Sequence, residues 1–326
     1  LNTGRIPVVY FQNSGLGNAV NPLLSLSHQN VYSIPMLLLI GWRGEVGKKD
    51  EPQHLVTGRI MIDMLKLLDI PFDVLPDYEE GIQHSVQTAA HYMRNNNAPY
   101  ALLVRKRTFL PYDFQSGIEY DEHLLSRKEA IQHIVDNVNG KSAFIPTTGF
   151  TSRELYEIRR DLQGKTGNND VKEFLTVGSM GHASAIALGM AQSCAADTAR
   201  NVVCIDGDGA LLMHLGTMSL VGHSRLSNMK HVLINNGCHD SVGGQPTTTS
   251  NTDFVAIAKA CGYKHCVSVS NKDDVIAAVQ DMDKASEGPY FLEINTKPGA
   301  SKNLARPKST PLQNKHDFMT FINKTN

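Results

Sequence analysis

The chain has 326 residues, with 31 basic and 32 acidic side chains and a formal net charge of −1. This length predicts about two domains, and a composition that is 41% hydrophobic and 19% charged can fill a core and is not that of a disordered chain. The balanced charge gives no electrostatic reason to expect nucleic acid or an anionic membrane as a partner. The longest apolar run, Pro35–Trp42, is too short to span a bilayer and predicts a buried strand.

Five cysteines are scattered along the chain, at positions 194, 204, 238, 261 and 266. Their odd number and irregular spacing predict no disulfide framework and favour a reducing compartment. Cys261 and Cys266, with His265 beside them, match no zinc-binding spacing. We therefore expect a soluble, cytoplasmic protein.

Short apolar runs without strict alternation predict strands that helices cover on both faces. The predicted strands are Val8–Phe11, Met36–Gly41, Phe72–Leu75, Ala101–Val104, Ala143–Pro146, Asn201–Ile205, His231–Asn235, His265–Val269 and Tyr290–Asn295. The predicted helices are Gln53–Leu68, Arg127–Val138, Glu154–Leu162, Ala183–Ala195, Asp253–Cys261 and Asp273–Met282. This alternation predicts an α/β fold with parallel sheets.

The stretch Arg105–Asp121 has no clear periodicity and contains proline and glycine, so we interpret it as a linker. It separates two predicted domains, residues 1–118 and 119–326. The chain begins without an initiator methionine and runs almost at once into the strand Val8–Phe11. Because a buried strand is seldom the first element of a domain, we expect the first domain to be truncated at its N-terminus.

Two polar turns follow predicted strands one strand–helix–strand unit apart. Gly207-Asp208-Gly209 follows the strand at 201–205, and Asn235-Asn236 ends the strand at 231–235, with room between them for one crossover helix. Each turn alone is common loop chemistry. Together they lie where open parallel sheets bind ligands. Asp208, Asn236 and a loop carbonyl offer the oxygen ligands that Mg²⁺ prefers, and Gly209 lets backbone N–H groups approach phosphate.

These residues resemble the diphosphate–Mg²⁺ motif of thiamine diphosphate-dependent enzymes. The resemblance implies thiamine diphosphate and Mg²⁺ as cofactors, with Asp208, Asn236 and the carbonyl of Cys238 as metal ligands. Thr176–Ala183 resembles the segment that holds the aminopyrimidine, where Gly178 would supply a carbonyl and Met180 an N–H and an apolar wedge. The implied cofactor-binding residues are Thr148, Gly149, Gly178, Ser179, Met180, Asp208, Gly209, Ala210 and Asn236.

Four further segments resemble the phosphonopyruvate decarboxylase family: Gln12–Ala19, Gly41–Glu45, Asp50–His54 and His239–Pro246. The resemblance extends over nearly the whole chain, and the sulfopyruvate decarboxylases share much of it. It implies two thiamine diphosphate-binding-fold domains, a pyrimidine-binding domain at 1–118 and a diphosphate–Mg²⁺-binding domain at 119–326. It also implies a homo-oligomer, at least a dimer, with the active site between subunits.

The implied reaction converts 3-phosphonopyruvate to phosphonoacetaldehyde and carbon dioxide, a step of phosphonate biosynthesis. The implied substrate residues are Ser14, Arg43, His54 and His239. The Arg43 guanidinium suits phosphonate oxygens, because it offers two parallel N–H donors. His54 and His239 are the candidate catalytic residues, since histidine exchanges protons near neutral pH.

The family also uses an activating glutamate upstream of the strand that corresponds to Val8–Phe11. No residue before Val8 is acidic, so the sequence offers no such glutamate, and we expect a preceding segment of about 50–60 residues. Two alternatives to the phosphonopyruvate hypothesis stay open at this point. One is decarboxylation of sulfopyruvate or another 2-oxo acid, and the other is a non-catalytic subunit of the same fold that lacks the glutamate.

Overall fold

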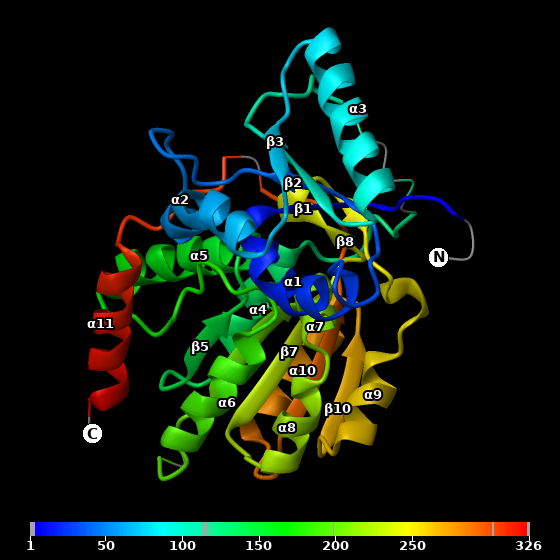
Figure 1. Cartoon of the computed structure of the whole chain (residues 1–326). Coiled ribbons are helices and arrows are strands. Elements are labelled where there is room, and N and C mark those ends of the chain that lie inside the picture. Colours follow the sequence, from blue (N-terminus) through cyan, green and yellow to red (C-terminus); the bar gives the residue numbers. More distant parts are fainter. Residues whose placement is uncertain are drawn as a thin grey trace. The chain divides into compact units, whose positions relative to one another are not determined.

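The computed structural model (Figure 1) describes residues 4–324 except residues 113, 115, 116, 118, 198 and 302. The chain divides into two compact units, Leu1–Asp113 and Phe114–Asn326. The predicted boundary falls a few residues later in the linker, and Ile118 lies outside the described residues.

The first unit is a parallel four-stranded sheet with helices on both faces. Its strand order is β1-β2-β4-β3. Its elements are β1 (Val8–Gln12), η1 (Asn13–Gly15), α1 (Leu16–Pro22), η2 (Leu23–Ser27), β2 (Leu37–Gly41), α2 (Pro52–Leu67), β3 (Phe72–Val74), α3 (Glu79–Asn96) and β4 (Tyr100–Val104). Helices α1 and α2 pack Leu16, Met61 and Leu65 on one face, whereas α3 packs Ala89 and Met93 on the other.

The first strand, β1, is more exposed than the sequence predicts. Val8–Phe11 was predicted as a buried strand, but Val8 and Tyr10 are 60% and 75% exposed. The reason is position, because β1 is an edge strand that pairs only with β2 among the described strands. An apolar run alone does not distinguish an edge strand from a central one.

The second unit is a larger parallel sheet, with strand order β10-β11-β7-β6-β5. Its strands are β5 (Ala143–Pro146), β6 (Val202–Gly207), β7 (Met229–Asn235), β10 (His265–Val269) and β11 (Tyr290–Asn295). Its helices are α4 (Arg127–Asn137), α5 (Phe150–Thr166), α6 (Ala183–Ser193), α7 (Asp208–Met213), α8 (Thr217–Ser224), α9 (Phe254–Cys261), α10 (Lys272–Lys284) and α11 (Pro311–Asn323), with short segments β8 (Cys238–His239), η3 (Asp240–Val242), β9 (Gln245–Pro246) and η4 (Thr249–Asn251).

Both faces of this sheet are covered. Helices α4, α5 and α10 bury one face, with residues such as Ile131, Leu155 and Val279. Helices α6, α8, α9 and α11 bury the other, with residues such as Ala187 and Phe254. The predicted parallel α/β architecture is therefore confirmed.

The element predictions hold for each predicted strand and helix to within a few residues, but they omit several elements. Helices α1, α3, α7, α8 and α11 and the antiparallel pair β8–β9 were not predicted. Two helices, α7 and α8, fill the connection between β6 and β7, where one was expected.

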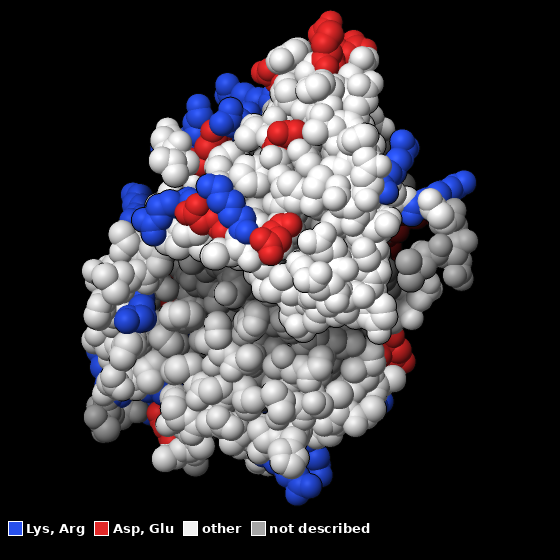
Figure 2. All heavy atoms as spheres, viewed as in Figure 1, with Lys and Arg blue, Asp and Glu red and all other residues white. Residues whose placement is uncertain are grey.

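All five cysteines are unbridged. None of the helices in the described ranges is long and apolar enough to cross a bilayer. On the face shown in Figure 2, basic and acidic side chains are interspersed. The first turn of α3 holds two acidic residues, Glu79 and Glu80.

Candidate active site

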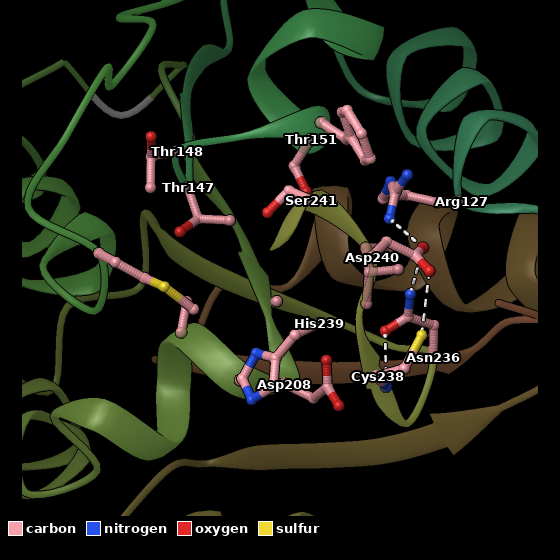
Figure 3. A pocket seen from close by; sticks show the side chains of 16 residues that line it. Arg127, Thr147, Thr148, Thr151, Asp208, Asn236, Cys238, His239, Asp240 and Ser241 are labelled. Atoms are coloured by element: carbon pink, nitrogen blue, oxygen red, sulfur yellow. Dashed lines mark hydrogen bonds and ion pairs between the residues drawn. The ribbon is translucent and has the colours of Figure 1, made fainter. Parts of the chain in front are cut away.

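A pocket of the second unit lies at the carboxyl ends of β5, β6 and β7 (Figure 3). Eight predicted site residues line it together: Thr148, Met180, Asp208, Gly209, Ala210, Asn236, Cys238 and His239. The predicted Gly149 and Ser179 each adjoin a lining residue in sequence, and Gly178 lies two positions before Met180, but none of these three lines the pocket. The parallel topology explains why these residues lie together, because parallel strands direct their carboxyl ends to one edge of a sheet.

Asp208 is the first residue of α7 and is only 3% exposed. Its Oδ2 accepts a hydrogen bond of 2.7 Å from the Thr247 hydroxyl and a longer one of 3.3 Å from the Thr249 hydroxyl. Across the described part of the chain, no lysine or arginine forms an ion pair with Asp208. Burial raises the pKa of its carboxyl above the ordinary value. A buried carboxylate without a cationic partner is electrostatically incomplete, and a divalent cation would complete it.

Asn236 and Cys238 follow β7, on the loop beside Asp208. The side-chain amide nitrogen of Asn236 donates to Asp240 Oδ2 at 2.7 Å, and its oxygen accepts from the backbone N–H of Cys238 at 3.3 Å. The Cys238 thiol donates to Asp240 Oδ1 at 3.0 Å. Burial, and then the bond to Asp240, raise the pKa of this thiol, so it stays protonated. A thiol in this state is a donor and does not compete with oxygen for Mg²⁺.

Arg127 lies at the opposite wall, at the start of α4, with a side chain 7% exposed. Its Nε donates to Glu154 at 2.8 Å and its Nη1 to Asp240 at 2.9 Å. Burial alone would lower the pKa of the guanidinium, but the carboxylates of Glu154 and Asp240 outweigh it and raise the pKa. The guanidinium therefore stays charged between two acids.

The amino end of α5 also faces the pocket. Thr148, Phe150 and Thr151 line it, and Gly149 at the N-cap has φ +93°, a conformation that favours glycine. No side chain caps this end of the helix. A 17-residue helix whose first N–H groups have no side-chain cap offers donors to an anion such as diphosphate.

The turn before α6 positions Met180 at the pocket wall. The backbone is left-handed at Ser179 (φ 51°) and Gly181 (φ +91°), on either side of Met180. A Cβ added at Gly181 would lie 2.6 Å from the His214 ring and 3.0 Å from the carbonyl of Ala210. The turn is therefore packed closely against α7, which fixes where Met180 projects.

His239 covers Gly209. A Cβ added at Gly209 would lie 2.4 Å from His239 Cε1 and 2.6 Å from Nδ1. The imidazole can occupy this place beside Asp208 only because residue 209 is glycine.

The remaining predicted residues belong to the first unit. The guanidinium of Arg43 donates to the Asp50 carboxylate from Nε, at 2.9 Å, and from Nη2. Two of its nitrogens are therefore already bound to a carboxylate of the same loop. His54 is buried near the start of α2, its Nδ1 has no hydrogen-bond partner among the described residues, and burial, followed by the charge of Arg43, lowers its pKa. Ser14 is exposed in η1.

The residues present fit a diphosphate held through Mg²⁺. The buried, cation-free carboxylate, the neighbouring amide and backbone oxygens, and the uncapped helix end provide complementary partners for both the metal and its anion. Sequence reasoning missed three contributors: Arg127, Asp240 and Thr247. Arg127 and Thr247 lie outside the segments that resemble the family. Asp240 lies within one of them, His239–Pro246, but the sequence alone assigns it no role.

Part of the second unit matches a known domain family, and nearly the whole chain is similar to known proteins. The C-terminal TPP binding domain of thiamine pyrophosphate enzymes matches residues 165–294. Phosphonopyruvate decarboxylase of Streptomyces viridochromogenes is 33% identical over 346 aligned positions, covering 98% of this chain and 80% of that protein.

Two sulfopyruvate decarboxylase sequences are also similar. That of Methanosarcina acetivorans is 26% identical over 319 positions, covering 91% of this chain and 77% of that protein. The subunit beta of Methanocaldococcus jannaschii is 38% identical over 137 positions, covering 42% of this chain and 66% of that subunit.

Proposed function

Since this chain belongs to the thiamine diphosphate-dependent 2-oxo acid decarboxylases of the phosphonopyruvate and sulfopyruvate type, we propose that its substrate is 3-phosphonopyruvate. The chain is a carboxy-lyase, and its cofactors are thiamine diphosphate and Mg²⁺. The observation that carries the choice of substrate is 33% identity to a phosphonopyruvate decarboxylase over 98% of the chain, against 26% over 91% for the sulfopyruvate enzyme of Methanosarcina acetivorans. The products are phosphonoacetaldehyde and carbon dioxide.

When bound, thiamine diphosphate supplies the electron sink for cleavage of the carbon–carbon bond. In our proposal Asp208, Asn236 and the backbone carbonyl of Cys238 hold Mg²⁺. The backbone at Gly209 and Ala210 and the amino end of α5, with Thr148 and Gly149, receive the diphosphate. Gly178, Ser179 and Met180 hold the aminopyrimidine, and the thioether of Met180 supplies an apolar wall.

Substrate recognition needs cationic and proton-donating groups. We assign Arg43 and Ser14 to the phosphonate and carboxylate, and His54 and His239 to proton delivery. The lowered pKa of His54 makes its imidazolium a stronger acid, which suits a group that gives up a proton. The Asp50 contact engages Nε and Nη2 of Arg43 and holds the guanidinium in one place, so the substrate anion would be met by its remaining N–H groups.

The active protein in this proposal is a homo-oligomer, at least a dimer, with the active site between subunits. The related sulfopyruvate enzyme of Methanocaldococcus jannaschii is named as having subunits. The first unit exposes large apolar side chains, among them Tyr10, Leu26 and Tyr32, which are 75%, 49% and 68% exposed. Apolar side chains exposed in such number are typical of association surfaces. Sedimentation showing an active monomer would contradict this part of the proposal.

The test of the substrate is kcat/KM for phosphonopyruvate, sulfopyruvate and pyruvate. A phosphonate carries more negative charge than a sulfonate at neutral pH, so a site built around arginine should favour phosphonopyruvate. Arg43→Ala should lower kcat/KM for phosphonopyruvate about tenfold to several thousandfold, and far less for pyruvate. Asp50→Asn is the matched control, because it loosens the same loop and keeps the guanidinium.

Equal losses on phosphonopyruvate and pyruvate would show that Arg43 supports the loop rather than the phosphonate. A preference of the unchanged protein for sulfopyruvate would establish the second candidate instead. The 38% identity to a sulfopyruvate decarboxylase subunit over 137 positions favours that candidate.

A further inference from the structure

Asp240 collects hydrogen bonds from four residues. Its Oδ2 accepts from Asn236 Nδ2 at 2.7 Å and from Arg127 Nη1 at 2.9 Å. Its Oδ1 accepts from the Cys238 thiol at 3.0 Å, and the backbone N–H of Gly299 lies 3.1 Å from both oxygens. The side chain is 10% exposed. Figure 3 shows the contacts with Arg127, Asn236 and Cys238 converging on this one carboxylate.

The carboxylate determines which way the Asn236 amide points. An ionised carboxylate can only accept, so the atom that faces Asp240 must be the amide nitrogen. The amide oxygen then faces away from Asp240, where its partner is the N–H of Cys238 at 3.3 Å. A carbonyl-type oxygen has two lone pairs, so one remains for a metal ion.

Arg127 keeps Asp240 in this role. Its side chain is 7% exposed, and it joins Asp240 to Glu154 through bonds of 2.9 and 2.8 Å. Its Nη2 also donates to the carbonyl of Gly299 at 3.2 Å. These contacts hold the guanidinium against Asp240 and use its N–H groups for contacts within the protein.

We propose that Asp240 is a positioning residue of the metal site, which orients the amide oxygen of Asn236 toward Mg²⁺ and anchors the Cys238 segment. The inference rests on the metal ligands assigned under the proposed function. It adds an outer residue that touches two of the three ligand residues and is itself held by Arg127. Outer partners of this kind typically change metal affinity 10- to 100-fold when they are removed.

The first test is Asp240→Asn. An asparagine side chain has one acceptor oxygen and one NH₂ group, so it cannot accept from all four donors, and the hold on Asn236 or on the Cys238 segment is lost. We expect the Mg²⁺ concentration for half-maximal thiamine diphosphate binding, measured by calorimetry on the whole chain, to rise about 10- to 100-fold. The melting temperature without metal should stay near that of the unchanged protein, because Arg127 keeps its bond to Glu154. Asp161→Asn is the matched control, since Asp161 is a 60% exposed residue of the same unit.

The second test exchanges donor and acceptor. Asn236→Asp alone sets two carboxylates against each other, whereas combined with Asp240→Asn it restores one donor facing one acceptor. If the contact positions the ligand, Asn236→Asp should tighten Mg²⁺-dependent binding at least about tenfold more in the Asp240→Asn background than in the unchanged protein. Additive effects would overturn the proposal, because they would mean that residues 236 and 240 do not act on metal binding through each other.

The outcomes separate the two proposals. Absence of Mg²⁺-dependent cofactor binding in the unchanged protein would overturn the ligand assignment, and this inference with it. Binding that is normal in the unchanged protein and equally tight in Asp240→Asn would overturn the inference alone. A lower metal-free melting temperature without any shift in Mg²⁺ dependence would show a structural role and would also overturn it.

Discussion

The Thr247 hydroxyl donates a hydrogen bond of 2.7 Å to the carboxylate of Asp208, 39 positions earlier in the chain. The Thr249 hydroxyl lies 2.8 Å from the Thr247 hydroxyl and 3.3 Å from Oδ2 of Asp208. Both threonines are donors to Oδ2. The loop after β9 thus holds one oxygen of the carboxylate that we assign to Mg²⁺.

Thr247→Val tests this relationship, because valine keeps the shape and removes the hydroxyl. A hydrogen bond to a charged group contributes about 1.5–3 kcal/mol, so the Mg²⁺ requirement for thiamine diphosphate binding should rise about 10- to 100-fold. Calorimetry over a series of Mg²⁺ concentrations measures it. Thr252→Val is the control, because the Thr252 hydroxyl donates only to the nearby carbonyl of Thr248. Equal Mg²⁺ requirements in the two variants would contradict the assignment.

Asp208→Asn should affect the loaded and metal-free proteins in opposite directions. The amide keeps an oxygen for Thr247 but removes the charged ligand, so Mg²⁺-dependent cofactor binding should weaken by at least about 100-fold. Without metal, the same change relieves a buried carboxylate that has no cationic partner in the described structure, so the melting temperature should hold or rise. Calorimetry with and without Mg²⁺ and cofactor measures both effects. A lower metal-free melting temperature would show that Asp208 already has a stabilising partner.

Gly209→Ala tests the place of His239. The added methyl carbon would lie 2.4 Å from the imidazole, so the ring must leave its present place. If His239 delivers a proton, kcat should fall at least about tenfold, and His239→Gln should reproduce the loss. Gly216→Ala is the control, because a Cβ there meets no atom within 4 Å. An unchanged kcat in Gly209→Ala would remove His239 from the reaction as we describe it.

The part of the site that sequence could predict is the part carried by strand ends. Asp208 and Asn236 follow apolar runs directly, and parallel strands bring such residues to one edge of the sheet. Arg127 and Asp240 could not be paired in this way, because they meet across 113 positions and neither lies in a periodic pattern that links them. Their contact depends on how α4 packs beside the loop after β7.

The omitted helices have a similar explanation. Helix α3 is an exception, because Ile82, Val86, Ala89 and Met93 recur at helical spacing and could have predicted it, although only Ser85, Ala89 and Met93 are buried in the structure. Helix α7 has six residues, too few to show a helical repeat. The edge position of β1 depends on the order of strands in the sheet, which composition does not encode.

Lys230 predicts a pH dependence of stability that is independent of the site. It lies in β7 with a fully buried side chain, and its ammonium donates to the carbonyl of Ala285 at 3.0 Å. Burial lowers its pKa from 10.5 to about 8, although the carboxylates of Asp283 and Asp281 oppose the shift. Between these two values the folded chain binds fewer protons at this lysine than the unfolded chain. Stability from this group therefore rises with pH across the window from about 8 to 10.5 and is lowest below it.

Lys230→Met should remove this dependence, because methionine fills similar space without a charge. The free energy of unfolding of the unchanged protein, relative to the variant, should increase as pH rises from about 8 toward 10.5. Urea unfolding at a series of pH values measures the difference. Lys264→Met serves as the control, because that lysine is 53% exposed and its replacement should give a difference nearly independent of pH over the same window. A difference that stays flat for Lys230→Met would mean that the ammonium keeps its ordinary pKa in the folded chain, through a solvent path or a stronger contact with Asp281 and Asp283.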